Sequence, residues 1–444
     1  MEHIDPTDIV NINERVRAWA GSEERLQPVR VDRIVIADDS IDALTDELRG
    51  MAAGKRVLVV VDQTPMRRGG DDLKPLLEEA MARVCEPDVR TPADDAHGHF
   101  HADFESAQRF AGELGGQPGN YAAIVSIGSG SITDVAKYAR HLHAEKTGAS
   151  VPFVCFPTAA SVTAYTSALA VLTIAGVKRT LPALPPDIVI CDLRTLADAP
   201  RRMTQAGFGD VLARSVSYGD WYLANQLGMD DGFSLVPGSL LEHAEREMLG
   251  VATGVATGDR AAVHAVMNAL LLAGMAMSVV RQTAPLSGWE HAISHFFDLT
   301  AAGDGRKQAL HGAQVGVATL VSARAYELAW NELDVEQLSS DRDETAYHKT
   351  LERVFGRYDT NGTLLAELWE DLARKLVRRR ESAAVRERFI VRKRAGEYDE
   401  FITEAVKSVR AVENALRAAG APRRFCDLDE PIDVYSVTSA VRFA

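Results

Sequence analysis

The chain has 444 residues, of which 46% are hydrophobic and 25% are charged, the balance of a folded globular protein. A chain of this length exceeds one ordinary hydrophobic core, so we expect two domains. The 49 Lys and Arg residues against 63 Asp and Glu residues give a net charge of −14, which argues against nucleic acid or an anionic membrane as the main partner.

The start of the chain indicates the compartment, and the spacing of its cysteines argues against two kinds of cysteine site. The first eight residues are polar and acidic, without the pattern of a signal peptide, so we expect a cytoplasmic location. The four cysteines are far apart and form no CxxC pair, which argues against a zinc knuckle or a redox dithiol. Cys155 and Cys191 lie in apolar runs and are predicted to be buried.

Four apolar runs in the first half predict buried parallel strands. These runs are Arg56–Asp62, Ala122–Ile127, Pro152–Phe156 and Asp187–Asp192. The second run leads through Gly128-Ser-Gly-Ser131 into a helical stretch at Ile132–Leu142. Because strands that alternate with helices predict a parallel sheet, residues 1–197 are expected to form an α/β, Rossmann-like dinucleotide-binding domain.

Strand-like runs disappear after about residue 197, and long helical patterns follow. The predicted helices are Pro237–Gly250, Ala261–Val280, Gly288–Thr300, Gly312–Trp330, Leu364–Val391 and Glu400–Ala419. The second of these is long enough to span a membrane, but it contains His264 and Asn268, which favour a buried helix and no membrane insertion. Asn331–Tyr347 is polar and acidic and is predicted to be a surface connection. Residues 198–444 are thus expected to form an all-helical metal- and substrate-binding domain, with a ligand cleft at the junction.

A nucleotide site is indicated where the second predicted strand ends. Gly128-Ser-Gly-Ser131 suits a pyrophosphate cradle, because glycine lets the backbone approach closely and a helix N-terminus offers free N–H groups. A tight strand-to-helix turn uses the same residues, so the motif alone leaves both interpretations open. Asp62 is placed to accept a hydrogen bond from a ribose hydroxyl, or simply to start a loop. Pro157-Thr-Ala-Ala-Ser161 follows the third strand and either lines a cofactor or forms an ordinary turn.

Two histidines and a carboxylate indicate a metal site. His291 and His295 are four residues apart in a predicted helix, which puts both imidazoles on one face. His311 opens the next helical segment, and Asp210 lies upstream; two histidines and one carboxylate with an open position suit a catalytic divalent ion. A helix cap or a solvated face explains each residue alone, but the set favours the metal. Zinc proteases have Glu after the first His of HxxxH, and Ala292 stands there.

These motifs together resemble the iron-containing alcohol dehydrogenase superfamily, which includes glycerol dehydrogenase and dehydroquinate synthase. Within it, the chain is most similar to the sn-glycerol-1-phosphate dehydrogenase family. The ordered motifs are Gly128–Lys137, Pro157–Ser161, Leu181–Pro186, Ala206–Asp210, Asp220-Trp221, Ser287–His295 and Leu310–Gly316. The resemblance implies a dehydroquinate synthase-like fold, with an α/β N-terminal domain and an all-α C-terminal domain, in a homo-oligomer.

The resemblance also implies roles for individual residues. It implies that Gly128, Ser129, Gly130, Ser131 and Ile132 contact the pyrophosphate, and that Thr158, Ser161 and Ser167 contact the nicotinamide. It also implies that Asp210, His291 and His311 bind the ion and that His295 contacts the substrate. The cofactor is NAD or NADP, and an acid at Asp62 favours NAD. Zinc is the first choice for the ion, with nickel and iron as alternatives, because this donor set suits all three.

Two departures from the family bear on the substrate. Thr163 stands where relatives usually carry an Asp that binds a substrate hydroxyl, and Leu184 replaces a basic residue. The departure at Thr163 favours a different phosphorylated or bulkier hydroxy compound over glycerol phosphate. Lys178 and Arg179 are either contacts for a substrate anion or members of a solvated loop.

The predicted activity is the metal- and NAD(P)-dependent interconversion of a secondary alcohol and a ketone. The expected substrate pair is sn-glycerol 1-phosphate and dihydroxyacetone phosphate, or a related phosphorylated polyol. One alternative is a sugar-phosphate cyclase of the dehydroquinate synthase type, which normally has Glu where this chain has Asp210. The other is a non-catalytic, metal-stabilised binding protein, which is supported only by the replacement of the usual Asp by Thr163.

Overall fold

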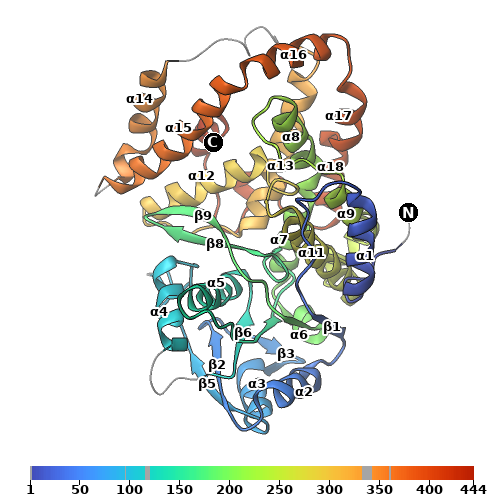
Figure 1. Ribbon diagram of the computed structural model, residues 1–444, viewed down its shortest axis with the longest axis vertical. Coiled ribbons are helices and arrows are strands. Elements are labelled where there is room, and N and C mark those ends of the chain that lie inside the picture. The colour runs from blue at the N-terminus through green and yellow to red at the C-terminus, as the bar shows by residue number, and fades with distance from the viewer. Residues whose placement is uncertain (1–2, 96, 116–120, 333–342, 360–361) are drawn as a thin grey trace.

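A parallel sheet forms the N-terminal half of the protein (Figure 1). The computed structural model describes residues 3–95, 97–115, 121–332, 343–359 and 362–444. The strand order is β1-β10-β7-β6-β2-β5, and every pairing is parallel. The strands are β1 (Arg33–Ala37), β2 (Arg56–Val61), β5 (Glu86–Arg90), β6 (Ala123–Gly128), β7 (Phe153–Pro157) and β10 (Ile188–Asp192). The four predicted strands are β2, β6, β7 and β10, which confirms the parallel sheet.

Helices cover both faces of this sheet, as its continuous apolar strands require. Alternate residues of β2 point to opposite faces: Val57 and Val59 join one buried cluster, and Leu58 and Val60 join another. Helices α2 (Ile41–Ala52) and α3 (Leu73–Ala82) supply the first cluster, and α4 (Phe104–Gly115) and α5 (Gly130–Thr147) supply the second. Cys155 and Cys191 are fully buried, as predicted.

An antiparallel hairpin was missed by the sequence analysis. It consists of β8 (Leu169–Ile174) and β9 (Val177–Pro182), so the proposed solvated loop at Lys178 and Arg179 is wrong. Ala175 and Gly176 both have positive φ, 49° and 82°, as the favoured two-residue hairpin turn requires. A second, shorter hairpin pairs β3 (Arg67–Arg68) with β4 (Asp71–Asp72).

The C-terminal half is helical in every part that the structure describes, apart from turns and connections. Its helices are α6 (Leu193–Asp198), α7 (Arg201–Leu212), α8 (Arg214–Gln226), α9 (Val236–Gly250), α10 (Ala252–Thr257), α11 (Arg260–Val280), α12 (Trp289–Gly303), α13 (His311–Ala329), α14 (Glu344–Phe355), α15 (Thr363–Glu381), α16 (Ala383–Arg394), α17 (Asp399–Ala405), α18 (Val409–Ala418) and α19 (Val434–Phe443). Helix α1 (Ile9–Ala20) from the start of the chain packs against α9. Short 3-10 turns cover Gly356–Tyr358 and Phe425–Asp427.

Two predicted helices are each divided in the structure. Leu364–Val391 breaks at Ser382, whose hydroxyl donates to the carbonyl of Arg378 at 2.8 Å, a local bond that competes with regular helix. Glu400–Ala419 breaks before Ser408, which is extended and caps α18 by accepting from the Ala411 amide. Of the predicted connection at Asn331–Tyr347, residues 333–342 lie outside the described part, and α14 begins at Glu344.

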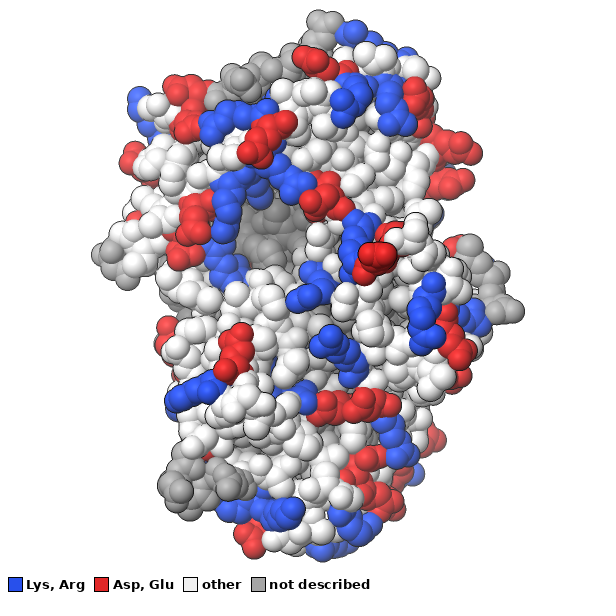
Figure 2. Space-filling model, in the orientation of Figure 1, with Lys and Arg blue, Asp and Glu red and all other residues white. Residues whose placement is uncertain are grey.

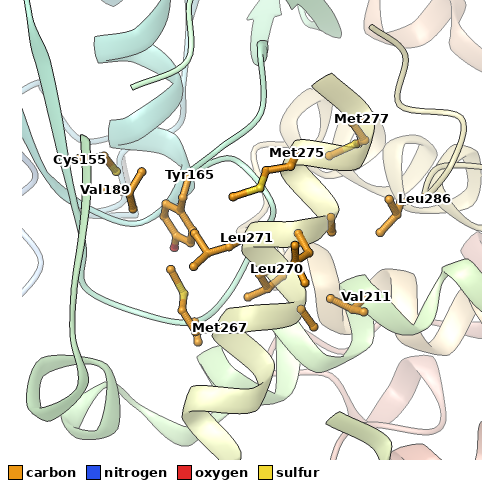
Figure 3. Close-up of a cluster of buried hydrophobic side chains, with 14 of the residues drawn as sticks. Cys155, Tyr165, Val189, Val211, Met267, Leu270, Leu271, Met275, Met277 and Leu286 are labelled. Carbon is orange, nitrogen blue, oxygen red and sulfur yellow. The ribbon is translucent and has the colours of Figure 1, made fainter. Parts of the chain in front are cut away.

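Helix α11 carries the core that the two halves share. Its side chains Met267 and Leu271 face Tyr165 and the sheet residue Val189 (Figure 3). Among the described residues, α11 is the one helix long and apolar enough to cross a membrane, but 78% of that window is buried inside the protein, as for the core helix of a folded domain. The predicted domain boundary after residue 197 falls at the end of α6 and stays a prediction.

Candidate metal and nicotinamide site

Three helices bring the predicted metal ligands together. Asp210 lies near the end of α7, His291 in the first turn of α12, and His311 at the start of α13. Oδ1 of Asp210 is 3.5 Å from Nε2 of His291 and 4.0 Å from Nε2 of His311, and one ligand atom from each residue lies within 4.8 Å of the others. Since zinc binds such atoms at about 2.0–2.2 Å, three donors at this spacing fit around one ion.

Close packing of α7 against α13 creates this proximity. A Cβ on Gly209 would lie 2.3 Å from the carbonyl oxygen of Gly312, and a Cβ on Gly312 would lie 2.1 Å from the carbonyl oxygen of Ala206. The two backbones therefore meet without side chains between them. Because Asp210 and His311 adjoin these glycines in the sequence, the helix crossing sets their separation.

Buried polar groups orient both imidazoles. Glu290 is fully buried, and its Oε1 accepts from the amide of Gly288 at 2.7 Å and lies 2.9 Å from Nδ1 of His291. Nδ1 of His311 lies 3.1 Å from the Ser294 hydroxyl. With each Nδ1 engaged, each Nε2 is presented to Asp210, the arrangement typical of metal-binding histidines. Sequence reasoning missed this role of Glu290, although an acid directly before the histidine was its visible signal.

Asp220 fixes the beginning of α12. Its carboxylate accepts from the amide of Trp289 at 2.9 Å and from the hydroxyl of Tyr326 at 2.5 Å. Burial, together with the nearby charge of Glu290, raises the pKa of Asp220 to about 6. This contact gives the Asp220-Trp221 motif, which had no assigned role, a positioning function for the helix that carries His291.

The protonation preferences of the three histidines differ. Burial acts to lower the pKa of His291, but hydrogen bonds to Asp210 and Glu290 outweigh it and raise the pKa to about 9. Burial lowers the pKa of His295 to about 3 and holds that of His311 well below its ordinary value. His295 and His311 thus present neutral imidazoles, the form that binds a metal, and His291 must lose its proton when an ion binds.

His295 lies beside the three ligands, with Asp298 as its neighbour. Its ring centroid is 5.4 Å from that of His311, and its Nδ1 is 4.0 Å from Oδ2 of Asp298. A second group of three donors, His295, Asp298 and His311, is therefore possible. However, Asp298 already accepts from Lys178 at 2.6 Å and from Gln314 at 3.0 Å, so the Asp210 group is better suited to an ion.

The two basic residues of β9 are both paired within the protein. Lys178 bonds to Asp298, and Arg179 bonds to Glu367 at 2.6 Å and to Asp371. Lys178 lines the same pocket as Asp210, His291 and His311 and remains a candidate anion contact. Arg179 is held by two carboxylates of α15, which removes it from that role.

One pocket of about 190 Å³ joins the metal triad to part of the predicted cofactor site. Its lining includes Gly130, Ser131, Thr163, Ser167, Asp210, His291, His295 and His311, together with hairpin residues. Thr158 and Ser161 are buried, and the Ser161 hydroxyl lies 3.2 Å from the Tyr165 hydroxyl. The structure therefore places eight of the predicted site residues around one cavity.

The start of α5 has the free donors that a pyrophosphate needs. Ser129 is the N-cap without a side-chain cap, and the first amide bonded back to it is that of Thr133. The glycines also serve packing: a Cβ on Gly128 would lie 3.0 Å from the Ile132 side chain, and one on Gly130 would lie 2.6 Å from that of Val162. The side chain of Ile132 is fully buried, so only its backbone is available for the predicted pyrophosphate contact, which stays a prediction.

Asp62 follows β2, as predicted. Its carboxylate accepts from the amide of Thr64 at 2.9 Å, and burial raises its pKa. The predicted ribose contact of Asp62 stays a prediction.

Comparison with known proteins identifies the family. Residues 35–200 match the iron-containing alcohol dehydrogenase family. The glycerol-1-phosphate dehydrogenase (NAD(P)+) of Bacillus licheniformis is 30% identical over 299 residues, which is 67% of this chain and 71% of the relative. This chain belongs to the iron-containing alcohol dehydrogenase family. The glycerol-1-phosphate dehydrogenase (NAD(P)+) of Geobacillus thermodenitrificans is 30% identical over 325 residues, 72% of this chain and 76% of the relative.

Solved structures share the fold of this chain. A 1,3-propanediol oxidoreductase aligns with a TM-score of 0.57 and 17% identity, covering 94% of this chain and 93% of that one. A sulfoacetaldehyde reductase from Bifidobacterium kashiwanohense, solved with NAD+, aligns with a TM-score of 0.55 and 16% identity over 93% of this chain and 90% of that one. The comparisons thus confirm the predicted family, fold class, oxidoreductase class and NAD(P) dependence. They do not identify the metal.

Proposed function

We propose that this family member is a soluble cytoplasmic enzyme that interconverts a secondary alcohol and a ketone on a phosphorylated polyol. The pair sn-glycerol 1-phosphate and dihydroxyacetone phosphate is the first candidate, since relatives at 30% identity carry the name glycerol-1-phosphate dehydrogenase. The observation that carries the proposal is the meeting of the Asp210 group and the start of α5 around one pocket.

The residues present fit one divalent ion. Asp210 and His291 are buried, and the Nε2 atoms of His291 and His311 face the same carboxylate while their Nδ1 atoms are engaged elsewhere. An ion held there supplies Lewis-acid polarisation of the substrate oxygen. The three protein ligands leave a coordination position open for that oxygen, the composition of a catalytic site.

The remaining residues orient the reactants. The free amides at the start of α5 would hold the pyrophosphate, and Ser167 would line the nicotinamide side of the pocket. The nicotinamide would supply or accept the hydride. His295 lines the same pocket and contacts the substrate hydroxyl or relays its proton. Thr163 contacts the next oxygen of the substrate, and the ammonium group of Lys178, which lines the same pocket, attracts the phosphate of a three-carbon substrate.

The cyclase alternative is the main competitor, because its relatives share the fold. Aspartate at position 210 favours the dehydrogenase, as do the names of the relatives that are 30% identical to this chain. The non-catalytic alternative remains a metal-stabilised binding protein.

Incubation of the zinc-loaded protein with NADH and dihydroxyacetone phosphate separates these three. We expect one NADH to be oxidised for each ketone reduced, with NADPH tested in parallel. A cyclase would release phosphate from a sugar phosphate without net NADH change, and a binding protein would show neither. Turnover that is identical in protein stripped of its metal would contradict the proposal.

A further inference from the structure

A second, larger cavity adjoins the catalytic pocket. It has a volume of about 1180 Å³ and shares His101, Thr173, Lys178 and His295 with the pocket. Helices α12, α14 and α15 and residues 442–444 supply most of the remaining wall. Figure 2 shows a hollow with Lys and Arg side chains along its rim, where Figure 1 places β9, α12 and α15. We call this cavity the outer chamber.

The charges of the outer chamber are unevenly satisfied. Each of its aspartates has a partner within the protein: Asp95 with His101, Asp103 with Ser106, Asp298 with Lys178, and Asp371 with Arg179 and Arg374. Arg306 is paired with Asp304 at 3.2 Å. By contrast, three further cations of the chamber, Arg353, Lys375 and Arg442, have no carboxylate within 4.0 Å among the residues that the structure describes. These three cations are exposed and are therefore available to an anion in a chain of net charge −14.

Two of these cations are gathered around one aromatic ring. The guanidinium of Arg353 lies 5.6 Å, and that of Arg442 lies 5.3 Å, from the centroid of Phe443. Cation–π contacts of this kind attract a guanidinium to the ring without neutralising its charge. Two like charges beside one ring repel each other, and an anion bound between them relieves that repulsion.

Part of the lining of the outer chamber is apolar. It includes Phe296, Leu299, Val354, Phe355, Leu368 and Leu372, which suit the carbon body of a ligand rather than its phosphate. The chamber alone exceeds the roughly 300–1,000 Å³ that usually holds a drug-sized ligand. A triose phosphate bound at the Asp210 group would leave most of this space unused.

We propose that the outer chamber is the subsite for the anionic end of the substrate. This inference rests on the proposed chemistry and changes its preferred substrate from the three-carbon pair to a longer class: a phosphorylated ketone or secondary alcohol with a body of more than three carbons. Its reacting carbon lies at the Asp210 group, its carbon body along α12, and its phosphate among Arg353, Lys375 and Arg442. The rim residues thereby determine specificity for length and charge.

The test compares a short and a longer open-chain ketose phosphate. Dihydroxyacetone phosphate and ribulose 5-phosphate, whose ketone lies two carbons further from the phosphate, are reduced with NADH by the zinc-loaded enzyme. We expect kcat/KM for ribulose 5-phosphate to exceed that for dihydroxyacetone phosphate, and unphosphorylated ribulose to be a poor substrate. The triple variant Arg353→Gln, Lys375→Gln, Arg442→Gln should lower kcat/KM for ribulose 5-phosphate at least about tenfold, the loss expected for charge-assisted bonds. Activity on dihydroxyacetone phosphate should change less than twofold.

The control removes three exposed cations outside the chamber. Lys349→Gln, Arg388→Gln, Arg410→Gln changes the net charge equally and should leave both substrates unaffected. Equal or better use of dihydroxyacetone phosphate by the wild type, or an equal loss in both triple variants, overturns the inference. A rise in KM for NADH or NADPH without a change for the ketone assigns the chamber to the cofactor and also overturns it. In each of these three cases the enzyme still oxidises NADH in a metal-dependent reaction, so the proposed function is not contradicted. If no ketone supports metal-dependent NADH oxidation, the proposed function itself is wrong.

Discussion

Glu290 illustrates how a single buried residue prepares the site. Its carboxylate is inaccessible to solvent and bonds at the same time to the backbone of Gly288 and to His291. A carboxylate behind a metal-binding imidazole fixes the ring and increases its basicity. The residue is therefore expected to act on metal affinity through His291.

Replacing Glu290 by Gln keeps the shape and removes the charge. We expect the affinity for zinc to fall about 10- to 100-fold while the fold persists, because the amide oxygen still accepts a hydrogen bond. Competition with a zinc-binding dye measures the change. Glu78→Gln, at an exposed position of α3, is the control, and equal zinc affinity in both variants would sink the assigned role.

His291→Ala and His311→Ala test the ligands directly. Each change removes one of the donors that converge on Asp210, so bound metal and turnover should both be lost. Metal analysis of the purified variants, with circular dichroism to check the fold, gives the answer. Full metal occupancy in either variant would contradict the assignment.

Thr163 tests substrate choice at the same scale. It lines the pocket with His295 and offers an uncharged hydroxyl where relatives usually carry a carboxylate. Thr163→Asp adds a charge-assisted acceptor for a neighbouring hydroxyl, which is worth roughly 1–3 kcal/mol, or about 10- to 100-fold in kcat/KM on dihydroxyacetone phosphate. If the wild type already uses that substrate efficiently and the variant gains nothing, the departure at Thr163 is neutral.

At the scale of elements, the crossing of α7 and α13 is the decisive contact. Gly209→Ala would place a Cβ 2.3 Å from a backbone oxygen of α13, and backbone cannot move aside as a flexible side chain can. The helices must separate, which should cost about 1–3 kcal/mol in the free energy of unfolding and weaken metal binding with it. Urea denaturation and zinc titration measure the two effects.

A matched glycine shows whether the effect belongs to the crossing. Gly250, at the end of α9, has open space around its Cβ position, so Gly250→Ala should leave both stability and zinc affinity unchanged. A Gly209→Ala protein as stable as Gly250→Ala would mean that the two helices adjust freely. In that case the glycines do not set the distance between Asp210 and His311.

At the scale of the whole molecule, metal binding is expected to stabilise the fold. The ligands come from three helices of the C-terminal half, and an ion that binds only the folded state adds about 4 kcal/mol at a thousand times its Kd. A chelator should therefore lower the melting temperature, and added zinc should restore it. His291→Ala should not respond to the chelator, and a wild type that loses its metal without a change in melting temperature would refute the coupling.

Sequence alone determined much of this molecule. Continuous apolar runs predicted β2, β6, β7 and β10, because strands buried on both faces have no polar alternation. The helical period predicted α9, α11, α12 and α13, and motif order predicted the family. The edge strands β1 and β5 were missed because their burial is mixed, and α15 and α16 were merged because a local serine bond leaves no mark on the hydrophobic pattern.

What only the tertiary structure decided lies in contacts between residues that are remote in the chain. Residue type and order suggested Asp210, His291 and His311, yet their convergence depends on a glycine crossing that no local period encodes. The same holds for the orientation of His291 by Glu290, for the pairing of Lys178 with Asp298, and for the outer chamber, whose walls come from separate helices. Local propensity and periodicity act over a few residues, whereas these distances are set by packing of backbone against backbone across the whole fold.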